Sequence, residues 1–167
     1  MAGALIVTAA LGGADFAWLD RQRRAHFPPH RNQLPAHLTM FHALPPSSEE
    51  EVRGQLNLLT KRPPPLATIA GLINLGGGVA YRIESTELGE IRSDLADHFH
   101  GVLSAQDRSG WRAHVTIQNK VSVSEAKTLH RELERQFEPR PMAILGLSLH
   151  RYLDGPWQAV ESWPFRT

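Results

Sequence analysis

The sequence has no cysteine, little net charge and no long hydrophobic run, and each of these absences excludes a class of protein. Without cysteine the chain can form no disulfide, no thiolate nucleophile and no cysteine-ligated zinc site. A net charge of +1 provides no general attraction to nucleic acid. No stretch approaches the ~20 apolar residues that span a bilayer. We therefore expect a globular protein without a membrane partner, and the lack of cysteine fits a cytoplasmic location.

The charge that is present is unevenly distributed. One short stretch carries a cluster of basic side chains: Arg21, Arg23, Arg24, His26, His30 and Arg31. Such a cluster is either the solvated face of a helix or a basic flank that attracts phosphate groups. The sequence leaves both interpretations open.

Proline and glycine divide the chain into alternating strands and helices. Residues 1–13 are apolar but carry no basic residue ahead of the apolar run, so we interpret them as containing a first strand and not a signal sequence. The expected strands span residues 4–11, 37–44, 66–75, 79–84, 114–119, 142–153 and 157–163. The expected helices span residues 15–27, 48–61, 86–99 and 122–137, and a loop is expected at 101–112.

Local signals indicate where three of these helices begin. Asp15 is a plausible N-cap for the first helix, because its carboxylate can accept a hydrogen bond from a free backbone N–H. Ser48 with Glu51 has the spacing of a capping box, and so has Ser122 with Glu125.

The second half of the chain repeats the order of the first: strand, helix, loop, strand, helix, strand. The glycines at 76–78 lack the lysine and the following helix of a phosphate-binding loop, which favours a turn between the halves. A hairpin turn at 154–155 adds one last strand. We therefore expect an α+β fold in one bilobal domain, residues 1–167, with pseudo-twofold repeats at about 1–76 and 79–167.

The most informative pattern is a four-residue motif, His-x-Thr-x, that occurs twice. Its copies are residues 37–40, His-Leu-Thr-Met, and residues 114–117, His-Val-Thr-Ile. Because side chains alternate along a strand, each copy places its histidine and threonine on one face and its two apolar residues on the other. A single copy would be uninformative, since a histidine can sit in a core and threonine is a common strand residue. The matched pair predicts that the two polar faces meet across a cleft.

The doubled motif resembles the 2H phosphoesterase superfamily, also called the 2′-5′ RNA ligase-like or RNA 2′,3′-cyclic phosphodiesterase family. The resemblance extends through the element order over essentially the whole chain. It implies a bilobal fold in which two antiparallel β-sheets face a central cleft and the helices pack on the outside. It also implies a metal-independent enzyme without a nucleotide cofactor.

The residue types in the motifs suit the opening of a cyclic phosphate. If one imidazole is neutral and the other protonated, one can accept the proton of the attacking water while the other protonates the leaving oxygen. His37 and His114 are therefore the predicted catalytic residues, and either could act as the acid. Thr39 and Thr116 are predicted to bind the phosphate, because their hydroxyls can donate hydrogen bonds to the extra negative charge of the transition state.

Three further side chains are weaker candidates. Arg112 lies two residues before His114, so it would share that strand face and could bind phosphate, unless it is an ordinary surface arginine. Tyr152 and Trp157 flank the last turn, where either could stack on a base or pack into the core. Tyr152 is the one we include in the predicted site.

The other histidines are not expected to join the site. His42 would point to the face opposite His37 unless a bulge intervenes, and the rest are expected on the surface: His26, His30, His98, His100, His130 and His150. The spacing of His98 and His100 could indicate a metal pair, but no carboxylates or cysteines accompany them at ligand spacing, so we expect no metal site.

Three functions stay open at this point. The first is an enzyme acting on RNA ends or small cyclic nucleotides, with reverse 2′-5′ ligation a further question. The second is a module that binds a nucleotide or RNA end without turnover, and the third a hydrolase of a non-nucleotide phosphoester. The presence of both histidines and both threonines favours an enzyme. The motifs recognise phosphate and not a base, so the physiological substrate is not predicted. We expect a monomer.

Overall fold

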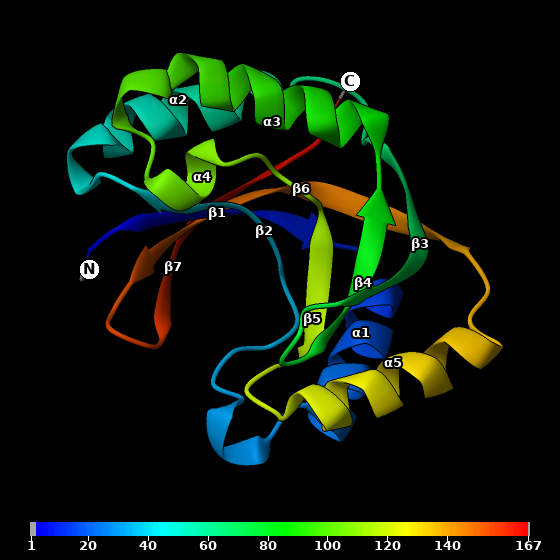
Figure 1. Cartoon of the computed structure of the whole chain (residues 1–167). Coiled ribbons are helices and arrows are strands. Elements are labelled where there is room, and N and C mark those ends of the chain that lie inside the picture. The colour runs from blue at the N-terminus through cyan, green and yellow to red at the C-terminus, as the bar shows by residue number, and fades with distance from the viewer. Residues whose placement is uncertain (1–2, 167) are drawn as a thin grey trace.

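The computed structural model describes residues 3–166, so the first two residues of the expected apolar start lie outside the described residues. Figure 1 shows a bent antiparallel sheet with helices at its two outer sides. The strands are β1 (Leu5–Leu11), β2 (Leu38–Leu44), β3 (Leu66–Asn74), β4 (Val79–Glu84), β5 (His114–Gln118), β6 (Arg140–Tyr152) and β7 (Trp157–Pro164). The helices are α1 (Gly13–His26), α2 (Glu49–Leu59), α3 (Thr86–His98), α4 (Ala105–Arg108) and α5 (Val123–Gln136). Short 3-10 turns are η1 (Pro29–Arg31), η2 (Pro46–Ser48) and η3 (His100–Val102).

The long strand β6 joins two antiparallel sheets. The strand order is β2-β1-β6-β3-β4-β5, with β7 also paired to β6. The start of β6, residues 140–143, pairs with β3, and its remainder pairs with β1 and β7. The predicted α+β class with antiparallel sheets is therefore confirmed. Because β6 comes from the second half of the chain and pairs with two strands of the first, the halves are interleaved.

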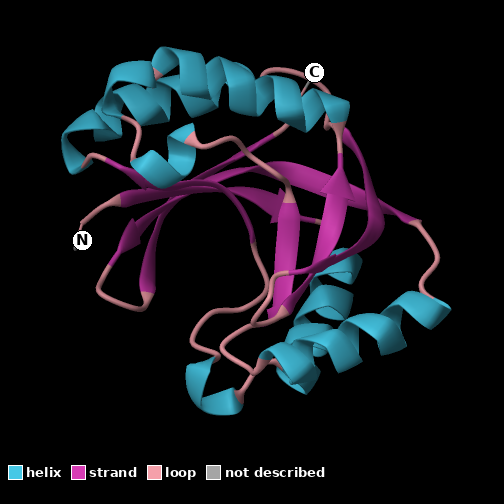
Figure 2. Ribbon diagram, viewed as in Figure 1, coloured by secondary structure: helices cyan, strands magenta, loops and turns pink. Residues whose placement is uncertain are grey.

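Helices cover the outer faces of both sheets, as Figure 2 shows. The helix α1 packs against β5 and α5 packs against β3, so the first helix of the chain covers a strand of the second half. The short helix α4 contacts β2. In the part of the chain that the structure describes, none of the helices has the length and hydropathy of a membrane span.

The two motif strands bury the residues that their alternation predicts. Leu38, Met40, Val115 and Ile117 are all 0% exposed. Full burial of such a side chain contributes about 1.5–3 kcal/mol. A slip of one residue in either strand would expose these side chains and bury the polar ones, so the apolar residues determine which way the histidines and threonines face.

Each motif strand carries a β-bulge one residue beyond its threonine. In β2, Thr39 lies opposite Thr8 and Phe41 opposite Val7, which leaves Met40 as the extra residue. A β-bulge of this kind bends the strand and changes its twist. In β5, Thr116 and Gln118 likewise lie opposite consecutive residues of β4, and the residue between them is extra. The matched bulges support the expected pseudo-twofold repeat, in which residues 79–167 repeat the arrangement of residues 1–76. That repeat stays a prediction.

The expected helix starts are partly wrong. α1 begins at Gly13, and Asp15 lies within its first turn, where its carboxylate accepts a hydrogen bond from Ala143 N at 2.9 Å. Asp15 therefore fastens α1 to β6 and does not cap the helix. Ser48 makes no capping bond, because it ends the turn η2 that leads directly into α2.

Other local predictions are confirmed. Ser122 caps α5 by accepting a hydrogen bond from Glu125 N at 3.1 Å. Residues 76–78 form the turn between β3 and β4, and residues 154–155, both with positive φ, form the turn between β6 and β7. The expected loop at 101–112 contains one short helix, α4, in addition to the turn η3. The hydroxyl of Ser104 caps this helix by accepting a hydrogen bond from Asp107 N.

Candidate active site

The two motif histidines are held in the same way. His37 directly precedes β2 and His114 opens β5. The Nδ1 atom of His37 lies 2.9 Å from Pro35 O, and that of His114 lies 2.7 Å from Arg112 O. A carbonyl oxygen only accepts hydrogen bonds, so Nδ1 carries the hydrogen in both rings. The Nε2 atom is then the free nitrogen, which accepts a proton when the ring is neutral and donates one when it is charged.

His37 has neighbours that disfavour its charged form. The pKa of His37 is lowered to about 4, with burial as the largest cause. The hydrogen bond to Pro35 O opposes this shift, and the positive charges of Arg23, His150 and His114 contribute to it. The strands that carry the two motifs, β2 and β5, contact each other, which brings the two histidines to the same region. At neutral pH, His37 is therefore an uncharged imidazole with a free Nε2.

The two threonines lie on the partly exposed face of their strands, with their histidines. Thr39 lies opposite Thr8, and Thr116 lies opposite Ala80. Within residues 3–166, neither threonine hydroxyl is hydrogen-bonded to another protein group. Both hydroxyls are therefore available to donate to an anion bound between the strands.

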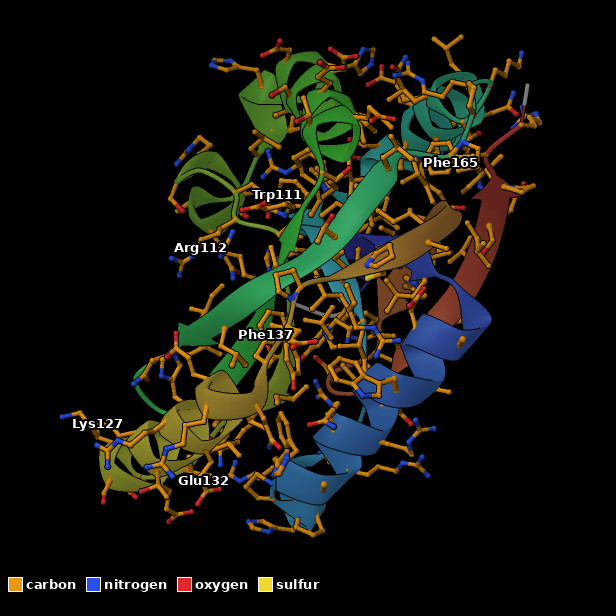
Figure 3. All side chains as sticks on the ribbon, turned by 90° about the vertical axis from the view of Figure 1, so that its right-hand side faces the viewer. Trp111, Arg112, Lys127, Glu132, Phe137 and Phe165 are labelled. Carbon is orange, nitrogen blue, oxygen red and sulfur yellow. The ribbon has the colours of Figure 1, made fainter. Side chains whose placement is uncertain are left out.

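The remaining predicted site residues are placed differently. Arg112 is exposed, and Figure 3 shows it next to Trp111 on the loop before β5. Its carbonyl oxygen orients His114, which is a contact that the sequence did not predict. Tyr152 is partly buried at the end of β6, directly opposite Trp157 across the hairpin. It is the indole of Trp157 that reaches His37, with the two rings edge-on at a centroid distance of 4.8 Å.

A cavity of about 340 Å³ opens beside His37. Its wall is mostly apolar, and none of the residues that line it is a lysine or arginine. The lining residues that matter here are Phe16, Pro35, His37, His150 and Trp157. Such a wall suits a flat, uncharged group of a ligand better than a phosphate.

The cavity also contains residues that the sequence did not single out. His150, expected at the surface, lies in its wall with Nε2 at 3.0 Å from Thr8 Oγ1, and burial lowers its pKa. Ser148 is bonded to Ser162 at 2.8 Å between their hydroxyl oxygens. Thr8, His150 and Ser148 in this wall therefore already have hydrogen-bond partners. Alternation along β6 puts His150 and Ser148 on one face, which is the signal that could have found them.

The bulge in β2 changes the environment of His42. Because Met40 is an extra residue, His42 returns to the face of Thr39 and is not on the opposite face as expected. Its Nδ1 lies 3.1 Å from Asp107 Oδ1. Asp107 also accepts hydrogen bonds from the backbone N–H groups of His42 and Ala43. Burial raises the pKa of Asp107, but its hydrogen bonds to His42 and Ala43 outweigh burial, so that the pKa is lowered overall. Within residues 3–166, no three His, Asp or Glu side chains gather closely enough to hold a metal ion.

The basic cluster of the sequence is not a uniform surface patch. Arg21 and Arg24 are exposed, whereas Arg23 is only 5% exposed. The guanidinium of Arg23 donates to Thr116 O from Nη1 at 3.0 Å and to Asn32 Oδ1 from Nε at 2.8 Å. One member of the cluster therefore belongs to the site, and its charge reaches His37.

Comparison with known proteins agrees with this geometry. Residues 13–156 match the 2′-5′ RNA ligase superfamily. The chain belongs to this superfamily. A comparison with curated proteins finds no match. The superfamily assignment accounts for the doubled motif and confirms the family that the sequence resembles.

Solved structures share the fold of this superfamily member. The crystal structure of TT0787 of Thermus thermophilus has a TM-score of 0.68 at 14% identity, over 98% of each chain. LigT of E. coli complexed with 3′-AMP has a TM-score of 0.62 at 15% identity over 100% of both chains. A structure described as a phosphoesterase has a TM-score of 0.60 at 17% identity, also over the full length of both. At these identities the likeness establishes the fold.

Proposed function

We propose that this protein is a phosphoesterase that opens 2′,3′-cyclic phosphates of RNA ends or nucleotides by acid–base catalysis with His37 and His114. The observation that carries the proposal is the matched pair of Nδ1–carbonyl bonds, which leaves one free Nε2 on each imidazole. Superfamily membership supports an enzyme of this kind. Substrates with 2′-5′ linkages belong to the same proposal, because their phosphodiester requires the same two proton transfers.

The buried environment of His37 favours it as the base. A neutral His37 accepts the proton of a water molecule through Nε2 as the water oxygen bonds to phosphorus. The bond from phosphorus to the 3′ oxygen breaks, and His114 in its protonated form donates its Nε2 proton to that oxygen. Water has then been added across one P–O bond, and the phosphate remains on the 2′ oxygen. These steps use only side chains of this chain, so we propose that the reaction needs no metal ion.

The threonine hydroxyls are proposed to stabilise the transition state. As the water attacks, negative charge increases on the two phosphate oxygens outside the ring. Donors that are already in place stabilise that charge without reorganising. Thr39 and Thr116 meet this requirement because their hydroxyls have no other partner within the described residues.

The cavity beside His37 is proposed to hold the base or another flat group of the substrate. Trp157 stands at its wall and could stack on such a group, in the role first considered for Tyr152. LigT has been crystallised with 3′-AMP and with NADP+, which supports a nucleotide as the occupant. Thr8, His150 and Ser148 in the wall already have hydrogen-bond partners, so few side chains are left to read the edge of a base. The same property favours a second candidate function, hydrolysis of a non-nucleotide cyclic phosphoester.

A substrate panel tests the proposed function. Purified protein is incubated with the four 2′,3′-cyclic nucleotides, RNA with a cyclic phosphate end, 2′-5′-linked dinucleotides and a non-nucleotide cyclic phosphate, each with and without EDTA. We expect turnover of the cyclic nucleotides, with weak preference among bases and no loss in EDTA. His37→Ala and His114→Ala should each lower kcat at least ~100-fold, whereas His30→Ala, at an exposed position, should not.

Two results would overturn the proposal. One is that a motif-histidine variant keeps the turnover of the wild type. The other is that EDTA abolishes activity and a single divalent ion restores it. Tight nucleotide binding without turnover of any substrate would instead support a binding module.

A further inference from the structure

Both motif strands are edge strands, so one side of each lacks a strand partner. β2 and β5 stand at the two ends of the strand order. Carbonyl groups on such an edge need another donor when they are shielded from water. At the two threonines the donor is a side chain. The indole Nε1 of Trp111 donates to Thr39 O at 2.9 Å, and the guanidinium Nη1 of Arg23 donates to Thr116 O at 3.0 Å.

Each of these bonds crosses between the halves of the chain. Trp111 belongs to the segment that leads into His114, yet it binds the strand of the other motif. Arg23 lies on α1, ahead of His37, yet it binds the strand that begins with His114. The approach to each histidine is thus fastened to the threonine of the opposite motif.

The helix α1 also holds the loop that leads to His37. Arg23 donates from Nε to Asn32 Oδ1, and one turn earlier Asp20 Oδ1 accepts a hydrogen bond from Ala36 N at 2.9 Å. Arg23 is 5% exposed, with its guanidinium 4.2 Å from the centre of the Phe27 ring. A buried arginine with a fixed fork of donors is a rigid connection between two segments.

We propose that Arg23 and Trp111 are positioning residues that hold the two His-x-Thr motifs at the separation that catalysis requires. The inference rests on the proposed phosphoesterase function. Neither residue exchanges a proton with the substrate. Each acts through the main chain of a threonine in the opposite half. A displacement of about 1 Å between reacting groups can lower a rate ~100-fold, so such bonds matter even though they do not touch the reaction.

Arg23 has a second effect that Trp111 does not share. The charged groups that act on His37 are Arg23 on α1, His150 on β6 and His114 on β5. All three disfavour a positive charge on His37, and Arg23 carries its charge at all relevant pH values. Removal of Arg23 should therefore raise the pKa of His37, whereas removal of the Trp111 indole N–H should leave it unchanged.

Four variants test the proposal: Arg23→Gln, Arg23→Lys, Trp111→Phe and the control Arg21→Gln. Arg21 is exposed on the same helix, and its replacement by glutamine removes the same charge as Arg23→Gln. The pKa of His37 is measured by NMR titration of its imidazole in the free protein, and kcat and KM are measured on a 2′,3′-cyclic nucleotide. Thermal unfolding checks that each variant is folded. The NMR measurement needs no activity, so it still tests Arg23 if the proposed function is wrong.

We expect Arg23→Gln to raise the pKa of His37 and to lower kcat at least ~10-fold with KM within about threefold. Arg23→Lys keeps the charge but loses the fork, so it should lower kcat with little change in that pKa. Trp111→Phe should also lower kcat with little change in the pKa of His37. Arg21→Gln should have the kcat and the His37 pKa of the wild type.

The proposal is overturned if Arg23→Gln titrates like Arg21→Gln, or if folded Arg23→Lys and Trp111→Phe both keep the wild-type kcat. Should Arg23→Gln fail to fold, the lysine and phenylalanine variants decide.

Discussion

A main-chain carbonyl determines which nitrogen of each motif histidine can react. Pro35 O and Arg112 O each accept a hydrogen bond from Nδ1, so both imidazoles are fixed in the same tautomer and orientation. In the proposed mechanism, this fixes Nε2 as the proton-transferring atom before any substrate binds. The role that we propose for the two threonines differs from that of the histidines, because a hydroxyl does not titrate near neutral pH.

Replacing Thr39 or Thr116 by valine should lower kcat by roughly 10- to 1000-fold, the range seen when a donor to a developing oxyanion is lost. Valine keeps the branched shape that suits a strand, so stability should change little. Because the hydroxyls stabilise charge and do not transfer protons, the shape of the pH–rate profile should be retained. Steady-state kinetics across pH measures both quantities. A threonine variant that shifts a limb of the profile would contradict this division of roles.

The depressed pKa of His37 makes the stability of the protein depend on pH. Between about 6.5 and about 4, the unfolded chain takes up a proton at this position and the folded protein does not. The free energy of unfolding should therefore decrease as pH falls from 6.5 towards 4. His150 and His26 also have lowered pKa values and act in the same direction.

Chemical denaturation of the wild type and His37→Asn at pH 7 and pH 4.5 measures this effect. The loss of stability between the two pH values should be smaller in the variant. His30→Asn, at an exposed position, is the control and should lose as much stability as the wild type. An equal loss in all three proteins would mean that His37 is not held neutral by the fold.

At the scale of elements, the bulges decide where each motif strand presents its side chains. Met40 in β2 and Ile117 in β5 occupy the same place, one residue after the threonine. In the second motif, the glycine turn adds a steric requirement. A Cβ at Gly78 would collide with the main chain of Gln118 and Asn119, directly after the bulge. Gly78 is therefore required by the close approach of the chain to β5.

Gly78→Ala should destabilise the protein and disturb the second motif. Overpacking of this kind costs about 1–3 kcal/mol, which lowers Tm by roughly 2–12 °C in a chain of this length. Gly89→Ala is the matched control, because a Cβ there meets nothing within 4 Å and alanine favours the interior of α3. Calorimetry of the two variants should show opposite shifts in Tm. Equal shifts would argue against a tight contact at Gly78.

The elements that could be predicted from sequence are those with a local cause. Alternation in residues 37–40 and 114–117 specified which side chains are buried, and Ser122 capped its helix as expected. The capping role of Asp15 was wrong because its carboxylate has a partner in β6, far along the chain. Local spacing carries no information about such a partner.

The missed members of the site are missed for the same reason. His150 was expected at the surface, yet it is hydrogen-bonded to Thr8 on β1. His42 was expected on the face opposite His37, but a bulge in β2 changes the face to which it points. Arg23 belonged to a basic cluster with two possible interpretations, and only the contact with Thr116 O separates it from its neighbours. Each of these positions depends on pairing between distant segments.

At the scale of the whole molecule, interleaving of the two halves builds the site. β6 of the second half pairs with β1 and β3 of the first, and α1 of the first half covers β5 of the second. The motif strands thereby become the outer edges of a single bent sheet, in contact with each other. Because strands and helices of each half pack on those of the other, we expect the chain to fold as one cooperative unit.

The most direct test of the two-histidine mechanism is the pH dependence of kcat/KM for a 2′,3′-cyclic nucleotide, under conditions where chemistry limits the rate. One imidazole must be neutral and the other protonated, so the wild type should give a bell whose limbs report the coupled pair. The residual activity of His37→Ala should lack the acidic limb of the bell, and the residual activity of His114→Ala should lack the alkaline limb. The product should carry a 2′-phosphate. A profile that is flat, or a bell that survives intact in either variant, would contradict the account.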